Sequence, residues 1–521
     1  MLNLAIVLED SARKYPAKEA FVFGDTRLNY AQVNGAANQI ANGLIAAGIQ
    51  PGDKVALSCL NLPYFPMIYY GILKAGGVVV PLSVLLKRNE VAYHLQDSDA
   101  KAYFCFQGTP ELPMGAEGHA GFQEAPGCEH FFMITAIPTD PSPIEGTKTL
   151  GMLMKDQAPV LESVQTKETD TAVIIYTSGT TGRPKGAELS HSNILQNTLM
   201  CSRLLQFQHD DNQLIVLPLF HIFGQVVQMN AGVFMGTRMV LLSRFDGDTV
   251  LGLMQKEKVS LFAGVPTMYW GLLNYQDDGK YDMQAIKANL RLCVSGGASL
   301  PVQVLKDFEA KYEVPILEGY GMSEGSPVVT FNHLDQERKP GSVGTPVWGV
   351  EVAVVDENDQ PVPQGEKGEI VYRGHNVMKG YYKRPEINQE VIRNGWLHSG
   401  DVGIFDEDGY LYIVDRTKDM IIRGGLNVYP REVEEAMMKH EAISLVAVIG
   451  VPHDQYGEEI KACVVLKEGA SVTEEALISW TKEQIAAYKY PRIITFMDAL
   501  PMNATGKILK KELRSTQEKV S

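Results

Sequence analysis

The sequence predicts an α/β protein with a large N-terminal domain and a small C-terminal α+β domain. Helical and strand-like patterns alternate near the start of the chain, with helical patterns at residues 34–47 and 64–74 and strand patterns at residues 55–59 and 77–82. Such alternation is typical of βα units built around a largely parallel sheet. A chain of 521 residues is also too long for one hydrophobic core, so two or more domains are expected.

The N-terminal part can be followed element by element. The opening residues, MLNLAIVLEDSARKYP, predict an amphipathic helix, because Glu9 and Asp10 interrupt the apolar run too early for a secretory signal. Residues 107–168 are rich in Pro, Gly and Thr with weak periodicity, so long loops are expected there. The run AVIIY at residues 172–176 predicts a buried strand, and Ser190 is expected to cap the next helix.

The C-terminal part is richer in strands. From about Gly344 the chain carries the short β-like segments VEVAVVD, GEIVYRG and YLYIVD. After Lys418 the segments VAVIGV, ACVVLK and RIITFM predict strands, and TEEALISWTKEQIAA predicts a helix. These later segments form a compact α+β unit of roughly a hundred residues, which is a normal domain size.

The composition argues against some classes of function. The net charge is −15, from 47 basic and 62 acidic residues, which argues against general nucleic-acid binding. The cysteines have no CxxC or metal-ligand spacing and are expected to be reduced, mostly buried thiols of a cytoplasmic protein. They are Cys59, Cys105, Cys128, Cys201, Cys293 and Cys463.

One uncharged stretch, residues 214–237, is long enough for a transmembrane helix. Pro218, His221 and three further polar side chains within it would be costly in lipid. We therefore expect a strand end, a loop and a buried helix here, and no transmembrane segment. An uncharged wall of this kind suits an apolar ligand. Peripheral membrane contact and a homodimer both stay open.

The run IIYTSGTTGRPKGAEL, residues 174–189, places four hydroxyl residues and three glycines around Arg183 and Lys185. A strand followed by such a loop can bind phosphates, because glycines let backbone N–H groups approach, hydroxyls donate and a lysine neutralises charge. The alternative is a mobile surface loop. The spacing does not match GxxxxGK[ST], which excludes a P-loop NTPase.

This run, with five further motifs in order, resembles the adenylate-forming (ANL) superfamily, and within it the acyl-CoA synthetase or fatty-acid–CoA ligase branch. The further motifs are SGGASL, EGYGMSE, WLHSGD, DRTKDMIIRGG and NATGKILKKEL. The resemblance covers essentially the whole chain, with one departure, Ser323, where the family usually has Thr. It implies a large N-terminal domain of parallel-rich βα-sheets plus a distorted β-barrel, and a small mobile C-terminal domain.

The resemblance also implies an ATP site. The loop from Thr177 to Lys185 would hold the β- and γ-phosphates, Tyr320 would stack on adenine, and Asp401 would accept the ribose hydroxyls. The full set of implied ATP or AMP contacts is Thr177, Ser178, Gly179, Thr180, Thr181, Lys185, Gly297, Ala298, Glu318, Gly319, Tyr320, Gly321, Met322, Ser323, Asp401, Arg416 and Lys507.

Three residues are implied to be catalytic: Lys507, Ser323 and Glu324. Lys507 would bridge the attacking carboxylate and the α-phosphate, Ser323 would contact that phosphate, and Glu324 would bind Mg²⁺. The reaction implied is attack of a carboxylate on ATP to give acyl-AMP and pyrophosphate, followed by displacement of AMP by the thiol of coenzyme A. A carrier-protein thiol remains open as the acceptor.

The two steps need different groups at one carbon, and family members rotate the small domain between them. Here the implied division is an adenylating domain at 1–415, a hinge at 416–418 and a mobile domain at 419–521, with Lys418 as the pivot. Rotation would remove Lys507 and bring in Gly424 and Gly425, which would let the pantetheine arm pass close to the backbone.

The acyl pocket is implied to be lined by three segments that carry no Arg or Lys to pair a second carboxylate and no Asp placed to take an amino group. Its expected residues are His221, Phe223, Val265, Thr267, Gly319, Met322 and Val328. We therefore expect a monocarboxylic acid with an apolar body, a medium- or long-chain fatty acid first and an aryl acid such as a cinnamate or benzoate second.

Two other classes of function remain as alternatives. Residues 321–325 fit G-x-S-x-G, the nucleophile elbow of serine hydrolases, with Ser323 as the nucleophile. An elbow must lead into a helix, whereas Ser326-Pro327 followed by VVTF predicts extended chain. A non-catalytic nucleotide-binding protein is the other alternative, and the presence of both Lys507 and Glu324 argues against it.

Overall fold

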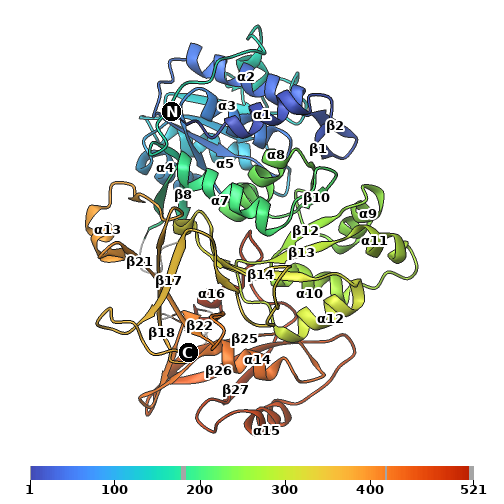
Figure 1. Ribbon diagram of the computed structural model, residues 1–521, viewed down its shortest axis with the longest axis vertical. Coiled ribbons are helices and arrows are strands. Elements are labelled where there is room, and N and C mark those ends of the chain that lie inside the picture. The colour runs from blue at the N-terminus through green and yellow to red at the C-terminus, as the bar shows by residue number, and fades with distance from the viewer. Residues whose placement is uncertain (1, 178–182, 417–418, 516–521) are drawn as a thin grey trace.

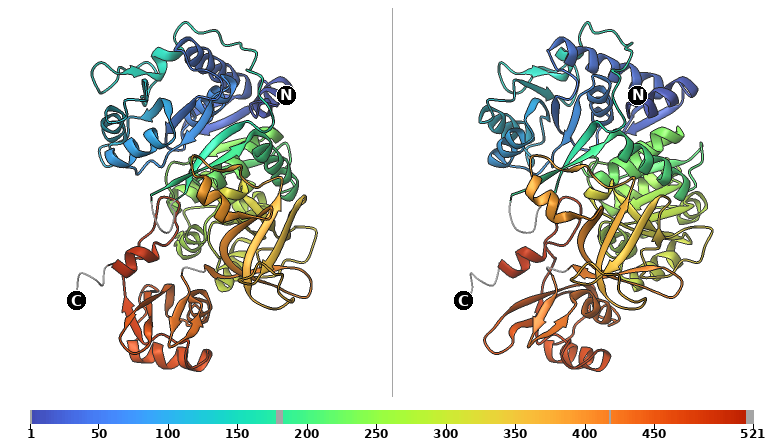
Figure 2. Two further views of the ribbon diagram at one scale, coloured as in Figure 1. Left: turned by 90° about the vertical axis from the view of Figure 1, so that its left-hand side faces the viewer. Right: turned by 60° about the vertical axis from the view of Figure 1, so that its left-hand side comes forward.

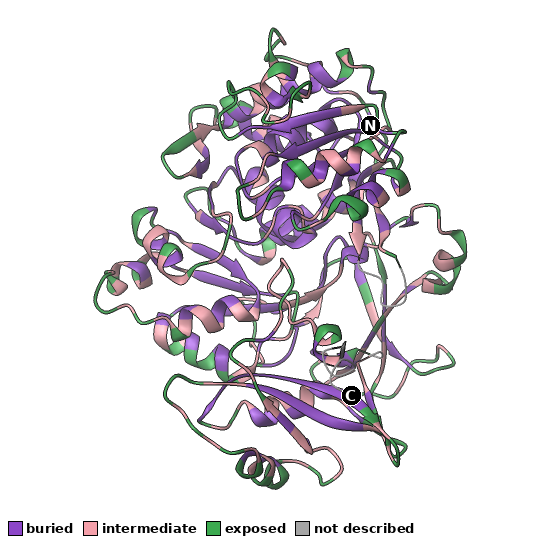
Figure 3. Cartoon of the chain, turned by 180° about the vertical axis from the view of Figure 1, so that it is seen from behind, coloured by how far each residue is buried: buried purple, intermediate pink, exposed green. Residues whose placement is uncertain are grey.

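The computed structural model describes residues 2–177, 183–416 and 419–515, and their strands form four sheets (Figure 1). The N-terminal sheets lie at the top and centre of the view, and the C-terminal elements lie at the bottom. The strands are mostly buried, whereas the outer faces of many helices are exposed (Figure 3).

The upper sheet is parallel from β8 to β7, and β9 and β19 extend it in antiparallel fashion. Its strands, in spatial order, are β19 (Gly380–Tyr381), β9 (Lys185–Ser190), β8 (Thr171–Thr177), β4 (Val78–Pro81), β3 (Lys54–Ser58), β5 (Ala100–Phe106), β6 (His130–Ile134) and β7 (Lys148–Thr149). The connecting helices are α2 (Tyr30–Ala46), α3 (Tyr64–Lys74), α4 (Arg88–Asp97), α5 (Met114–Gln123) and α6 (Leu150–Met154).

The central sheet has a parallel core from β14 to β1, with antiparallel strands at both edges. Its strands are β16 (Thr345–Pro346), β15 (Val328–Phe331), β14 (Ile316–Gly321), β13 (Leu292–Ser295), β12 (Leu261–Gly264), β10 (Asn212–Ile215), β11 (Arg238–Leu241), β1 (Glu19–Phe23) and β2 (Thr26–Asn29).

The helices of this central region are α1 (Ile6–Lys14), α7 (His191–Leu204), the π-helix η1 (Phe223–Asn230), α8 (Ala231–Met235), α9 (Gly247–Lys256), α10 (Pro266–Asn274), α11 (Met283–Asn289), α12 (Val302–Tyr312) and the 3₁₀ turn η2 (Ser323–Gly325). Helix α7 begins as predicted, because the Ser190 side chain caps it by accepting a hydrogen bond from the Asn193 amide.

The third sheet is antiparallel and curled. It consists of β17 (Val350–Val355), β18 (Gly368–Gly374), β20 (Ile392–Arg393), β21 (Trp396–Phe405) and β22 (Leu411–Arg416), with α13 (Pro385–Val391) beside it. It corresponds to the expected distorted barrel.

The C-terminal elements form the fourth body, which Figure 2 shows beneath and to one side of the rest. Its sheet comprises β23 (Ile421–Arg423), β24 (Leu426–Val428), β25 (Ile443–His453), β26 (Gly457–Leu466) and β27 (Ile493–Phe496), and its helices are α14 (Pro430–Met437), α15 (Glu474–Gln484) and α16 (Lys510–Ser515). Its apolar side chains form their own buried clusters, around Val448 on one side of the sheet and Ile449 on the other.

The prediction of long loops between residues 107 and 168 was wrong in part, because α5, β6 and α6 lie there. Helix α5 is glycine-rich, a composition that disfavours helix. Its glycines pack too closely on neighbours for any larger side chain: a Cβ on Gly118 would lie 2.5 Å from the Cys105 Sγ, and one on Gly121 would lie 2.6 Å from the Val91 Cβ. Tertiary packing therefore overrides the local propensity.

The prediction for residues 214–237 is confirmed. The stretch contains the end of β10, a turn, η1 and α8, and within the described residues no helix is long and apolar enough to cross a membrane. Polar side chains of this stretch donate hydrogen bonds inside the protein; the Gln228 Nε2, for example, donates to the Leu214 carbonyl at 3.1 Å.

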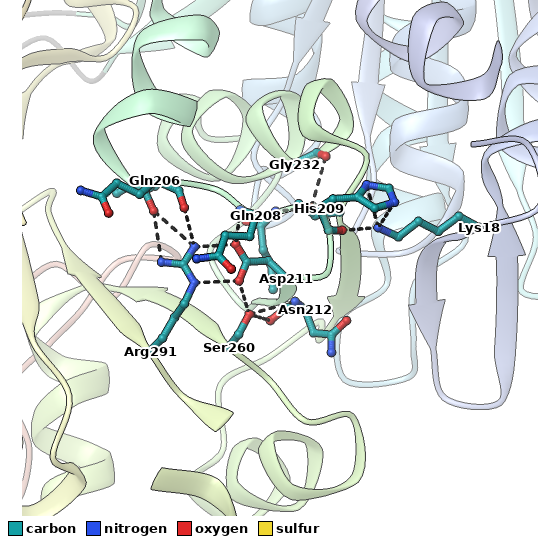
Figure 4. Close-up of polar contacts among 12 residues, drawn as sticks. Lys18, Gln206, Gln208, His209, Asp211, Asn212, Gly232, Ser260 and Arg291 are labelled. Atoms are coloured by element: carbon teal, nitrogen blue, oxygen red, sulfur yellow. Dashed lines mark hydrogen bonds and ion pairs between the residues drawn. The ribbon is translucent and has the colours of Figure 1, made fainter. Parts of the chain in front are cut away.

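A polar network ties together the amino ends of the central strands (Figure 4). Asp211, just before β10, receives two hydrogen bonds from the Arg291 guanidinium, at 2.8 and 2.5 Å, and one from the Ser260 hydroxyl at 2.7 Å. Ser260 and Arg291 immediately precede β12 and β13, so one carboxylate links the starts of three parallel strands.

Candidate active site

A cavity of about 590 Å³ opens at the other end of the same strands, between the central sheet, the curled sheet and the C-terminal body. Ligands of open α/β sheets commonly bind outside the carboxyl ends of the strands. The predicted site residues that line it are Thr177, Lys185, His221, Phe223, Val265, Gly297, Gly319, Tyr320, Gly321, Met322, Ser323, Glu324, Val328, Asp401, Arg416 and Lys507.

Other predicted residues do not line this cavity. Ser178, Gly179, Thr180, Thr181 and the hinge residue Lys418 lie outside the described residues. Ala298 and Thr267 do not line the cavity, and the Thr267 hydroxyl instead donates to the Gly506 carbonyl at 3.0 Å.

Glu318 is buried behind the cavity, where burial raises its pKa to about 7 while Arg431 of α14 acts to lower it. Gly424 and Gly425 form the exposed turn of the β23–β24 hairpin, both at positive φ, and are not in the cavity in this orientation of the C-terminal body.

Tyr320 and Asp401 meet at the end of the cavity where adenosine is expected. The Tyr320 hydroxyl donates to the Asp401 Oδ2 at 2.7 Å, and the Arg416 Nε lies 3.2 Å from the Oδ1. Asp401 on β21 is paired in register with Arg416 on β22, so the strand pairing itself sets this contact. Each carboxylate oxygen has a second lone pair, which leaves capacity to accept hydroxyl groups of a ligand.

Thr177, Lys185 and Glu324 surround the end where the phosphates are expected. Thr177 ends β8 and Lys185 begins β9, and the two are register partners. Residues 178–182 between them lie outside the described residues. Glu324 lies in the short η2 turn and its side chain accepts a hydrogen bond from the Tyr381 hydroxyl at 2.7 Å. Tyr381 lines the cavity, and the sequence analysis missed it because a tyrosine in a short edge strand carries no chemical signal.

Glu324 is suited to bind a Mg²⁺ ion that also contacts the phosphates of the nucleotide. Mg²⁺ is usually held by one or two carboxylates together with substrate phosphates and water. Among the described residues there is no group of three or more acidic, His or Cys side chains that could hold a metal by itself. A single carboxylate at the phosphate end therefore fits a metal that arrives with the nucleotide.

The η2 turn leads into β15 and not into a helix, because Val328–Phe331 is extended. The geometry of a nucleophile elbow is therefore absent around Ser323, as the sequence analysis expects.

Lys507 enters the cavity on a loop of the C-terminal body, which Figure 1 shows reaching up beside β14. An Asn503 side chain shapes this loop by accepting hydrogen bonds from the amides of Thr505 and Lys507, at 3.0 and 2.9 Å. Gly506 is required where the loop meets Val265, since its φ is +79° and a Cβ would lie 2.8 Å from the Val265 Cγ2. Burial, and secondarily the nearby Arg416, lowers the pKa of Lys507 to about 8.

The remaining end of the cavity is apolar. Beside the predicted His221, Phe223, Val265 and Val328, its walls include Leu217, Ile222 and Phe331, which the sequence analysis did not name. Burial lowers the pKa of His221 to about 4, so the imidazole is neutral at pH 7. The Phe223 amide donates to its Nδ1 at 3.3 Å, which leaves the Nε2–H as a donor.

The sequence analysis also did not predict a cluster of charged and polar side chains that lines the cavity. His398 lies 2.9 Å from the Glu369 carboxylate through its Nδ1, and Arg393 lies beside both. All three line the cavity on β18, β20 and β21. They come from three strands, so no local sequence pattern unites them.

Contacts between the C-terminal body and the rest hold Lys507 in this position. The Trp270 indole on α10 donates to the Ser444 hydroxyl on β25 at 3.1 Å. The Arg431 guanidinium on α14 donates to the Gly341 carbonyl at 3.4 Å. None of these four residues lines the cavity.

Comparisons with known proteins agree with this geometry. Residues 8–382 match the family model described as AMP-binding enzyme, and residues 432–507 match the AMP-binding enzyme C-terminal domain. The chain is 37% identical to a long-chain-fatty-acid–CoA ligase of Bacillus subtilis (98% of this chain, 94% of that one) and 36% identical to a feruloyl-CoA synthase of an Amycolatopsis species (96% of each).

Among solved structures, the ATP-bound form of MatB from Rhodopseudomonas palustris is 32% identical and superposes with a TM-score of 0.89 over 100% of both chains. The apo form of the same protein, compared over 99% of both chains, gives a TM-score of 0.79. The chain as a whole therefore superposes better on the ATP-bound form than on the apo form.

Proposed function

The chain belongs to the AMP-binding enzyme family, and from this premise we propose that it activates a monocarboxylic acid, most readily a medium- or long-chain fatty acid. An ATP-dependent acyl-CoA ligase is what the family and the relatives support. The observation that carries the reaction is the meeting of Lys507, Asp401 and Glu324 in one cavity with an apolar end.

In the proposed first step, a carboxylate oxygen of the acid attacks the α-phosphorus of ATP, and the bond to pyrophosphate breaks. Lys507 stabilises the negative charge that develops between the carboxylate and the α-phosphate, with Ser323 beside it. Lys185 and Thr177 hold the departing phosphates. Bound Mg²⁺, with Glu324 as a ligand, would offset their charge.

In the proposed second step, the sulfur of coenzyme A attacks the acyl carbon and AMP leaves. For this step the C-terminal domain, 419–521, rotates at Lys418, withdraws Lys507 and presents Gly424 and Gly425. The exposed β23–β24 hairpin supports this proposal, because a turn of two glycines at positive φ can lie against a thin pantetheine arm. We further propose that the enzyme acts in the cytoplasm.

The apolar end of the cavity supports a fatty acid as substrate. Each CH₂ buried there can contribute up to about 0.8 kcal/mol, or about fourfold in kcat/KM, until the cavity is full. A panel of straight-chain acids assayed for CoA-thioester formation should therefore show kcat/KM rising steeply with chain length. Equal kcat/KM for acetate and octanoate would contradict the proposal.

An aryl acid is the second candidate, and the neutral His221 favours it. The Nε2–H of this histidine is a hydrogen-bond donor inside an otherwise apolar wall, which would suit a ring hydroxyl such as that of ferulate. Including cinnamate and ferulate in the same panel distinguishes the two. A kcat/KM for ferulate above that of every fatty acid would identify an aryl acid as the preferred substrate.

A further inference from the structure

We propose that Tyr381 is a positioning residue for the first step, which holds Glu324 and Lys185 apart and directs both at the phosphate end of the cavity. This inference rests on the proposed function, because it takes these two residues to face the phosphates of ATP. Neither the motifs nor the chemistry of the reaction assigns Tyr381 a role.

One side chain contacts both charged groups. The Tyr381 hydroxyl donates to the Glu324 Oε1 at 2.7 Å, a hydrogen bond strengthened by the charge of the acceptor. The Lys185 ammonium lies 4.6 Å from the centre of the Tyr381 ring, within the range of a cation–π contact. The tyrosine is only 8% exposed, so little water competes for these contacts.

The backbone holds the ring in this place without any ligand. Strand β19 pairs with β9, and Tyr381 lies opposite Ala187, two residues after Lys185. The side chain of Asn388 on α13 accepts from the Tyr381 amide at 2.6 Å and donates to its carbonyl at 3.1 Å. Gly380 permits this approach, because a Cβ there would lie 2.6 Å from the Asn388 Nδ2. Tyr381 is thus preorganised by β9 and α13.

Separation of the two charges matters for the chemistry. An ammonium and a carboxylate about 4 Å apart attract each other, and more strongly near a protein surface than in bulk water. Collapsed into an ion pair, they would neutralise each other and offer less to phosphate and metal. In the described part of the chain neither Lys185 nor Glu324 has an ion-pair partner. Instead, Tyr381 donates a hydrogen bond to Glu324 and lies under the ammonium of Lys185.

The test compares binding of ATP with Mg²⁺ against binding of AMP, by calorimetry. AMP lacks the β- and γ-phosphates, so its affinity should not depend on the end of the cavity at Tyr381. Tyr381→Phe keeps the ring over Lys185 and removes the hydrogen bond to Glu324. We expect ATP to bind roughly tenfold more weakly, AMP to bind within about twofold of the parent, and half-saturation of ATP binding to require more Mg²⁺. Tyr381→Leu, which also removes the ring, should weaken ATP binding further.

The neighbouring Tyr382→Phe is the matched control, because the Tyr382 hydroxyl donates to the Asp99 carboxylate away from the cavity. It should bind both nucleotides as the parent does. Parental ATP affinity in Tyr381→Phe would overturn the inference, and so would equal losses for ATP and AMP, which would indicate a merely structural role. If the parent binds ATP and AMP but releases no pyrophosphate with any acid, the proposed function fails separately.

Discussion

Lys507 carries its charge only below the pH at which its ammonium loses a proton, and burial brings that pH down to about 8. Protonated Lys507 is the active form in the proposed first step, so kcat/KM for ATP should fall as the pH rises through about 8. The pH dependence of kcat/KM reports groups of the free enzyme, which is the state described here. The measurement is pyrophosphate release from neutral to alkaline pH.

Lys507→Arg provides the control for that profile. A guanidinium stays protonated throughout this range, so the variant should be slower but should lose the inflection near pH 8. An unchanged inflection in Lys507→Arg would assign it to another group.

That the motif residues gather at one place could be expected from the sequence, because the motifs resemble those of the adenylate-forming superfamily in type and order. Asp401, Glu324 and Lys507 line one cavity although 183 residues separate Glu324 from Lys507 in the chain. Tyr381 and His398 were not predictable in the same way. Tyr381 lies outside the quoted motifs, and its position depends on the pairing of an edge strand. His398 lies within the motif WLHSGD, but its carboxylate partner Glu369 comes from another strand, which the motif does not indicate.

At the scale of elements, the amino ends of the central strands depend on Asp211. Its carboxylate accepts from Arg291 and Ser260, and its side chain is 3% exposed. Asp211→Asn would place an NH₂ group against the guanidinium and should lower the free energy of unfolding by about 2–3 kcal/mol. Denaturant unfolding measures this loss.

The exposed neighbour Asp210→Asn is the control and should change stability by less than about 0.5 kcal/mol. Because the network lies at the end of the strands opposite the cavity, Asp211→Asn should keep the parental kcat at low temperature. A large loss of kcat without loss of stability would contradict a purely structural role.

Elements with strong periodicity were predicted well, and those built by close packing were not. The helices at α2, α3 and α7 and the strands at β3, β4 and β8 follow their local patterns. Helix α5 does not, since its glycines disfavour helix until Cys105 and Val91 pack against them. Single-sequence patterns carry no information about such partners.

At the scale of the whole molecule, a few polar contacts hold the C-terminal body in the orientation that presents Lys507. Trp270→Phe removes the hydrogen bond to Ser444, which is worth about 0.5–1.5 kcal/mol. It should therefore shift the equilibrium between orientations by up to about tenfold. Acyl-AMP formation should slow by up to that factor, whereas thioester formation from supplied acyl-AMP should be unchanged or faster.

Trp480→Phe is the matched control, because Trp480 packs against His440 within the C-terminal body. It should leave both half-reactions unchanged. Equal slowing of both half-reactions by Trp270→Phe would show that the contact supports folding and does not select an orientation.

The division of labour between the two steps is the central claim, and Lys507→Ala tests it most directly. The two half-reactions are assayed separately: acyl-AMP formation from acid and ATP, and thioester formation from supplied acyl-AMP and coenzyme A. Loss of one charge aimed at a transition state costs about 10²–10³ in rate, so acyl-AMP formation should fall by that factor. Thioester formation should stay close to the parental rate, and the exposed Lys511→Ala should affect neither. If Lys507→Ala slowed thioester formation as severely as acyl-AMP formation, the alternation of the C-terminal domain between two steps would be contradicted.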